Sequence, residues 1–287
     1  MRELNNHHAI IINSKNQCNC KYFNYYQMKK QGKIVFLIII LNTIVIANVM
    51  AANNMKDSTK LISQERTLKA FNSITSGAPV DFNISQGNTG SVTIKVPDAG
   101  MLNYIKTELR DGVLSVYVVK NNKFNWENSG SFTGGTSGGR PNKITIFITV
   151  KQLSSIHLSG SAIVYFIQDI SASGLSLDIS GSAGVKGAIK VHQLFGKLSG
   201  SADVAITGQV DNMDMNLEGS ATINAAHLLT SNARVNMQGS SIAKVKVSTQ
   251  LIAQAAGNSS LSYVGKATHQ AFNTSGNATI KQMVNDK

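Results

Sequence analysis

Cysteine, proline and tryptophan are scarce in this sequence, which has two, three and one of them in 287 residues. Both cysteines, Cys18 and Cys20, lie near the start of the chain, and no second pair completes a zinc site. A disulfide across one intervening residue would be strained. These absences exclude a disulfide-stapled domain, and we assign no metal and no cofactor. The low proline content, together with 42% hydrophobic residues, also argues against a disordered chain.

Acidic residues are also few: 15 Asp and Glu stand against 27 Lys and Arg, a net charge of +12. Most of the excess lies before residue 152, because residues 152–287 hold nine Lys and Arg against seven Asp and Glu. A protein that binds nucleic acid concentrates basic residues on its recognition surface. The nearly neutral C-terminal half therefore removes nucleic acid from the expected partners.

One long apolar run, IVFLIIILNTIVIANVM at residues 34–50, follows three lysines and precedes two alanines. A basic start, an apolar middle and small residues at the cleavage point are the parts of a secretory signal peptide. The sequence thus predicts an over-extended start at 1–27, a signal peptide at 28–51 and a mature chain that begins near Ala52. The alternative is an uncleaved anchor that crosses the membrane once.

A five-residue motif of the form LSGSA recurs through the C-terminal half. Its glycines are spaced by 18 to 21 residues. They are Gly160, Gly181, Gly200, Gly219, Gly239, Gly257 and Gly276. Such regular spacing is typical of a solenoid, in which each repeat is one coil stacked on the coil before it.

Around these glycines apolar and polar residues alternate with a period of two, which indicates strands with one buried face. The positions two and four before the glycine, and four after it, are mostly apolar, so we expect them to point inward. They are Leu158, Ile179, Leu198, Leu217 and Met237; Ile156, Leu177, Met215, Val235 and Phe272; and Val164, Val185, Val204, Ile223, Leu261 and Ile280. The coil after Gly239 departs from the pattern, and there Ile242 and Val245 are expected to fill the apolar places.

The sequence therefore predicts an all-β fold, a parallel β-helix (β-solenoid) of about 20-residue coils, over residues 154–282 with a short tail at 283–287. Each coil has two strands joined at a Gly-Ser-Ala corner, and a looser second corner often holds a glycine, as at Gly187, Gly208 and Gly265. Small residues at the corner let the coils stack closely. The motif serines have no histidine at a fixed offset, so we interpret them as corner packing and not as nucleophiles.

Residues 66–153 hold longer and less regular strands, after a linker at 52–65. The Asp111-Gly112 pair between two of these strands predicts a hairpin. This part either caps the open end of the β-helix or forms its first, distorted coils. The TSGA step at 75–78 favours the second possibility.

A loop insertion is expected at 121–142, which is rich in Gly, Ser and Asn and contains the only tryptophan. Trp126, with Phe124 and Phe132, could stack on a sugar ring, because an aromatic face suits the apolar side of a pyranose. The alternative is that these rings pin the loop to the body of the protein. The sequence leaves both possibilities open.

A second candidate site is the column of His157, Asp178 and Lys197, which occupy the same outward position on successive coils. They should lie about 5 Å apart. Solenoid enzymes that cleave acidic polysaccharides place acids and bases on one face of parallel strands, and general acid–base catalysis needs side chains at such distances. Opposite charges on neighbouring strands are also ordinary surface stabilisation. No second carboxylate stands near enough in register to complete a glycosidase pair, so we favour the surface interpretation and assign no catalytic residue.

Segments from both parts of the chain resemble one known family. They are RTLKAFNSI at 66–74, SVTIKVPD, TELRDGVLSV, KITIFITVKQLSSIHLSGSA and the repeated LSGSA. Together they are similar to the DUF2807 family of adhesin-head, or GIN, domains, over roughly residues 66–282. The resemblance implies a secreted or envelope β-helical domain, and it supplies no catalytic or binding residues.

We therefore expect an exported protein, in the periplasm, on the outer surface or secreted, that acts without catalysis in adhesion or surface binding. Its expected partners are a glycan, the cell wall or a surface protein, and it meets the membrane only through the signal peptide or an uncleaved anchor. Two alternatives stay open: an enzyme that processes polysaccharides on the same fold, and a periplasmic scaffold without a ligand.

Overall fold

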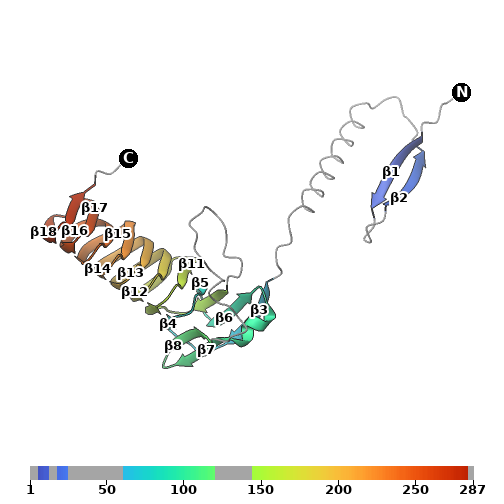
Figure 1. Cartoon of the computed structure of the whole chain (residues 1–287), viewed down its shortest axis with the longest axis horizontal. Helices are drawn as coiled ribbons and strands as arrows, with labels where there is room; N and C mark the ends of the chain where they lie inside the picture. The colour runs from blue at the N-terminus through green and yellow to red at the C-terminus, as the bar shows by residue number, and fades with distance from the viewer. Residues whose placement is uncertain (1–5, 13–17, 25–60, 120–143, 284–287) are drawn as a thin grey trace. The chain divides into compact units, whose positions relative to one another are not determined.

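The computed structural model describes residues 6–12, 18–24, 61–119 and 144–283 (Figure 1). The chain divides into two compact units, Met1–Ser58 and Thr59–Lys287. In the first unit, β1 (Asn6–Ile12) pairs antiparallel with β2 (Cys18–Asn24). The expected signal peptide and the expected loop insertion lie outside the described residues, so both stay predictions. Within the described part, no helix has the length and apolar character needed to cross a bilayer.

The second unit is almost entirely β-structure, and its strands form one continuous hydrogen-bonded sheet. Its first strands are β3 (Ile62–Thr67), β4 (Ser73–Ser76), β5 (Asp81–Gln86), β6 (Ser91–Val96), β7 (Ile105–Arg110), β8 (Val113–Val118) and β9 (Thr145–Val150). The later strands are β10 (Ser155–Leu158), β11 (Ile163–Phe166), β12 (Ile170–Ile179), β13 (Gly184–Leu198), β14 (Asp203–Leu217), β15 (Thr222–Met237), β16 (Ile242–Gly257), β17 (Ser260–Val264), β18 (His269–Gly276) and β19 (Thr279–Gln282). In the described part of this unit the one helix is a short 3-10 turn, η1 (Ala99–Asn103), so the expected all-β fold is confirmed.

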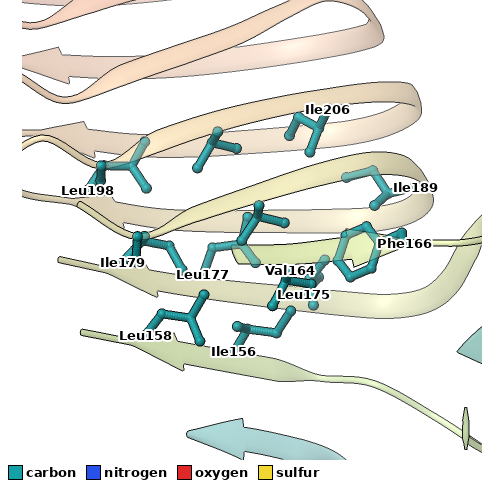
Figure 2. Packing of buried hydrophobic residues seen from close by; sticks show 14 of the residues in the cluster. Ile156, Leu158, Val164, Phe166, Leu175, Leu177, Ile179, Ile189, Leu198 and Ile206 are labelled. Carbon is teal, nitrogen blue, oxygen red and sulfur yellow. The ribbon is translucent and has the colours of Figure 1, made fainter. Parts of the chain in front are cut away.

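From β10 to β19 the strands pair in parallel, each coil against the coil before it, which confirms the predicted β-helix (Figure 1). The register places expected inward residues in one column: Leu158 pairs with Ile179, and Ile179 pairs with Leu198. These side chains are fully buried, and Figure 2 shows them directed into the interior of the coils. In the middle of the solenoid the second strand of one coil continues into the first strand of the next, so β13 to β16 are each 15 or 16 residues long.

The backbone conformation and the close approach of the preceding coil both restrict the corner positions to glycine. In all seven repeats φ lies between 70° and 80°, a left-handed conformation that favours glycine. A β-carbon on any of them would come within 2.6–3.0 Å of the carbonyl oxygen of the corner glycine one coil earlier. That oxygen also accepts a hydrogen bond: the N–H of Ser201 donates to Gly181 O at 2.7 Å, and the N–H of Ser220 donates to Gly200 O at 2.7 Å. The Gly-Ser-Ala motif is therefore a packing element, as the sequence indicates.

The second corners also carry glycines with positive φ, at Gly187 (140°), Gly208 (108°) and Gly265 (111°). A β-carbon on Gly208 would lie 2.1 Å from a carbonyl oxygen of the preceding coil. The expected second-corner glycines are thus confirmed. At the second corner β15 departs from the regular pairing: its register against β16 shifts between Ala225 and Leu229.

The TSGA step belongs to a coil. β4 pairs in parallel with β10, and β5 with β11, so residues 73–86 form the first coil. Gly77 lies at its corner, since a β-carbon on Gly160 would be 2.9 Å from Gly77 O. On the other side of this coil, β8 and β9 pair in parallel with β4 and β5 and add one more layer.

Antiparallel strands cover the N-terminal end of this stack. β6 pairs with β9, β3 with β6, and β7 with β8. Val92, Ile94, Val96 and Ile105 of these strands are fully buried. The turn from β7 to β8 is Asp111-Gly112, so the expected hairpin is confirmed; its φ values of 49° and 76° are those of a type I′ turn. The N-terminal part is therefore both a first coil and a cap.

Of three inward predictions near the C-terminal end, only that for Ile242 is wrong. Phe272 and Ile280 are in register with the buried Ala253 and Leu261, so they occupy inward positions that are incompletely covered. Ile242 is 46% exposed, because the backbone register places Ala243, and not Ile242, in the buried position next to Ile223. Phe272 on β18 is 41% exposed, because no further coil covers β18 in the described part of the chain. Ile280 on β19 is only half-buried for the same reason.

The corner contacts predict that Gly200→Ala lowers the free energy of unfolding by about 2–5 kcal/mol, from left-handed strain and overpacking together. Its φ is 71°, and an added β-carbon would be 2.9 Å from Gly181 O. The matched control is Gly174→Ala, whose β-carbon would meet only Gln193 O at 3.8 Å, so its effect should stay within about 1 kcal/mol. Chemical denaturation followed by far-UV circular dichroism measures both, and equally mild effects would contradict the corner assignment.

Candidate functional site

The outward side chains of the first strand of each coil form what we call the first-strand face. On it His157 pairs in register with Asp178, and Asp178 with Lys197, so the three form the expected column. His157 Nδ1 lies 3.0 Å from Asp178 Oδ2. Lys197 is the next position in the column, but its ammonium group makes no ion pair with a described carboxylate. The role of these three residues in binding stays a prediction.

The His157–Asp178 contact is open to solvent. The two side chains are 52% and 49% exposed. An exposed polar contact of this kind stabilises a protein by about 0–1 kcal/mol at most, because solvent screens it and ordering two side chains opposes it. The contact can therefore orient a side chain for a ligand, but it contributes little to the stability of the fold.

A second His–Asp pair lies elsewhere on the coils, and sequence reasoning missed it. His192 Nδ1 lies 2.7 Å from Asp211 Oδ2. Both residues stand 11 positions after a corner glycine, Gly181 and Gly200 respectively. That shared offset is the signal that could have found the pair, because equal offsets place side chains next to each other on adjacent coils.

Asparagine amides form ladders along the outside of the coils. Asn236 Nδ2 donates to Asn216 Oδ1 at 2.9 Å, and this pair continues the His157 column. The other ladders join Asn232 to Asn212 at 3.0 Å and Asn277 to Asn258 at 3.1 Å. An amide has one acceptor and two donor hydrogens, so each ladder fixes its side chains and still leaves hydrogen-bonding capacity toward solvent.

The aromatic candidates Trp126, Phe124 and Phe132 lie outside the described residues. The described first-strand face instead presents Phe195, which is 50% exposed and which sequence reasoning missed. It stands two residues before Lys197 on β13 and pairs in register with Ser176 and Asp214. Its signal was an aromatic residue at an outward position.

Two side chains with shifted pKa values belong to the N-terminal cap. Burial lowers the pKa of Arg66, whose guanidinium donates to Thr107 Oγ1 at 2.8 Å and to Ile105 O at 3.0 Å and so ties β3 to β7. A hydrogen bond to Glu108 raises the pKa of Tyr117 in the β7–β8 hairpin. Both contacts hold the cap together. Within the described ranges no three His, Cys, Asp or Glu side chains are grouped to hold a metal ion.

Comparison with protein families gives one match, over residues 70–267. The matching family is DUF2807, described as "Putative auto-transporter adhesin, head GIN domain". No protein with a curated description matches the sequence.

Solved structures share the fold at low sequence identity. A "putative adhesin" from Bacteroides fragilis is 22% identical and covers 79% of this chain and 98% of its own, with a TM-score of 0.68. A "putative adhesin" from Parabacteroides merdae is 20% identical and covers 80% and 99%, with a TM-score of 0.57. A "Putative lipid binding protein" from Parabacteroides distasonis is 18% identical and covers 78% and 97%, with a TM-score of 0.56. At these identities the comparison establishes the shared β-solenoid.

Proposed function

This chain belongs to the DUF2807 family of adhesin-head GIN domains, and on that premise we propose that it is an exported, non-enzymatic protein of the cell envelope that binds surface material. The material would be a glycan, the cell wall or a surface protein. The binding surface would be the outside of the coils, where side chains repeat in register from one coil to the next.

The observation that carries this proposal is the fixed spacing of polar groups on the first-strand face. Its column runs from His157 through Asp178 and Lys197 to Asn216 and Asn236, one residue on each coil. Parallel strands place such residues about 4.8 Å apart. A rigid array loses little conformational entropy on binding, so many weak polar contacts to a repeating polymer can add up. Phe195 adds an exposed aromatic face beside the column.

Export is the second part of the proposal. It is supported by the order of a basic segment, the apolar run at 34–50 and small residues before Ala52. The family's description as an adhesin head agrees with a location outside the cytoplasm.

Fractionation of cells that make the protein, with mass spectrometry of the purified chain, tests compartment and processing together. We expect the protein in the envelope or secreted fraction, with an N-terminus near Ala52 and with wall or surface material bound to it. A cytosolic protein that still carries Met28 would contradict the proposal. A control in which the apolar run is interrupted by Ile38→Lys and Ile44→Lys should leave the protein in the cytosol.

A second candidate, a polysaccharide-processing enzyme, is favoured by one observation. The 3.0 Å contact of His157 with Asp178 is the arrangement in which a carboxylate orients a histidine for proton transfer. If the protein cleaves an acidic polysaccharide, Asp178→Ala should reduce the rate by about 100-fold or more. The matched control is Asp211→Ala, which removes the carboxylate of the His192 pair. Release of reducing ends measures the rate. No cleavage by the unaltered protein would reject the enzyme, and equal effects of both variants would reject the His157–Asp178 pair as its site.

A further inference from the structure

The charges of the repeat region are separated along the chain, although their sum is small. From residue 152 to Glu218 there are six Asp and Glu against three lysines. From residue 219 to the end of the described chain at 283 there are five Lys and Arg and no acidic residue. The middle coils are therefore acidic and the last coils are basic.

Four of these cations lie around the second strand and second corner of the last coils, and we call them the C-terminal basic face: Lys244, Lys246, Lys266 and Lys281. Lys244 pairs in register with Ser262, and Ser262 pairs with Lys281. Lys244 and Lys281 thus stand in one column two coils apart, at roughly 10 Å by the usual strand spacing.

The other two lysines extend the face toward the second corner. Lys246 is two residues after Lys244, so its side chain leaves the same side of β16. It pairs in register with Val264, and Lys266 follows Val264 by two residues, next to the corner at Gly265.

No described carboxylate neutralises this face. Lys186 in the acidic coils has Asp203 at 3.4 Å, whereas none of the four lysines has an ion-pair partner among the residues that the structure describes. Cations that are close together and unpaired create a positive potential, which attracts anions and weakens as salt is added.

The surroundings of the lysines distinguish among polyanions. The neighbouring outward positions carry hydroxyl groups, at Ser260, Ser262 and Thr279, and Thr279 Oγ1 donates to Ser260 Oγ at 3.3 Å. The outward positions of β16, β17 and β19 carry no aromatic ring of the kind that single-stranded nucleic acid stacks on. A membrane would need several apolar anchors beside the cations. Three large apolar side chains near them are partly exposed, namely Ile242, Met283 and Leu229, which is in register with Lys246, so a vesicle is a necessary competitor in the test.

We propose that the C-terminal basic face binds an acidic polysaccharide, with the lysines pairing to its carboxylate or sulfate groups and the hydroxyl groups hydrogen-bonding to its sugar rings. This inference rests on the proposed function, because it names the chemical class of the surface material. It also places a binding site away from the His157, Asp178 and Lys197 column.

The test measures binding of the full chain to dextran, dextran sulfate and polygalacturonate by biolayer interferometry, at 50 and 200 mM salt. We expect binding to the two acidic polymers, weaker at the higher salt, and little binding to dextran. Lys244→Gln, Lys246→Gln and Lys281→Gln together should weaken binding by about tenfold or more, because they remove most of the local positive charge. All three side chains reach solvent, so circular dichroism should show an unchanged fold.

The matched control is the triple variant Lys151→Gln, Lys186→Gln and Lys190→Gln, which removes the same net charge from positions outside both the basic face and the His157 column. It should change binding less than twofold. Equal losses in the two triple variants would overturn the proposal, since binding would then follow total charge and not this face. Tighter binding to phosphatidylglycerol vesicles or to a single-stranded DNA oligonucleotide would overturn the ligand class.

Failure of this proposal is distinguishable from failure of the proposed function. If the C-terminal triple variant still binds the acidic polymers as tightly as the unaltered chain, the basic-face site is overturned and a surface-binding protein remains. A protein found in the cytosol with Met28 intact, and with no affinity for any glycan, would overturn both.

Discussion

The contact between each corner glycine and the glycine carbonyl of the preceding coil is the constraint on which the solenoid depends. A β-carbon at any of these corners would lie 2.6–3.0 Å from that oxygen, closer than real side chains approach. The same oxygen accepts the N–H of the residue after the next corner glycine. Close approach and hydrogen bond together fix where one coil lies on another, and a slip by one residue would turn every inward side chain outward.

The columns on the outside of the coils follow from this register. His157 meets Asp178, Asn216 meets Asn236, and Lys244 is aligned with Lys281, because each set stands at a constant distance from its corner glycine. A polymer whose chemical groups repeat along its length can therefore contact side chains that repeat along the coils. The charges differ between the parts: the middle coils hold three aspartates that contact a histidine or lysine, and the last coils hold lysines without an ion-pair partner among the described residues.

Much of the fold could be predicted from the sequence, because the strongest signals are local. The glycine spacing and the period-two alternation predict the coils, and Asp111-Gly112 predicts the hairpin. Ile242 was misjudged because its hydrophobicity was weighed above its offset from Gly239, which puts Ala243 inside. The sequence left open whether the N-terminal part is a cap or a first coil, and the strand pairing of the cap could not be predicted, since β6 pairs with the distant β9 and no local pattern specifies that partner. The His192–Asp211 pair carries a weaker signal, since its one mark in the sequence is an equal offset of 11 residues from Gly181 and Gly200, far from the motif itself.

Backbone amide hydrogen exchange at the corner serines of the full chain tests the central constraint most directly. Ser182, Ser201 and Ser220 have exposed side chains, but their N–H groups donate to the preceding glycine carbonyls at 2.7 Å. The account predicts that these amides exchange as slowly as those of Val185 and Val204 in the buried strands. Serine amides that exchange at the rate of an open loop, while the valine amides stay protected, would contradict it.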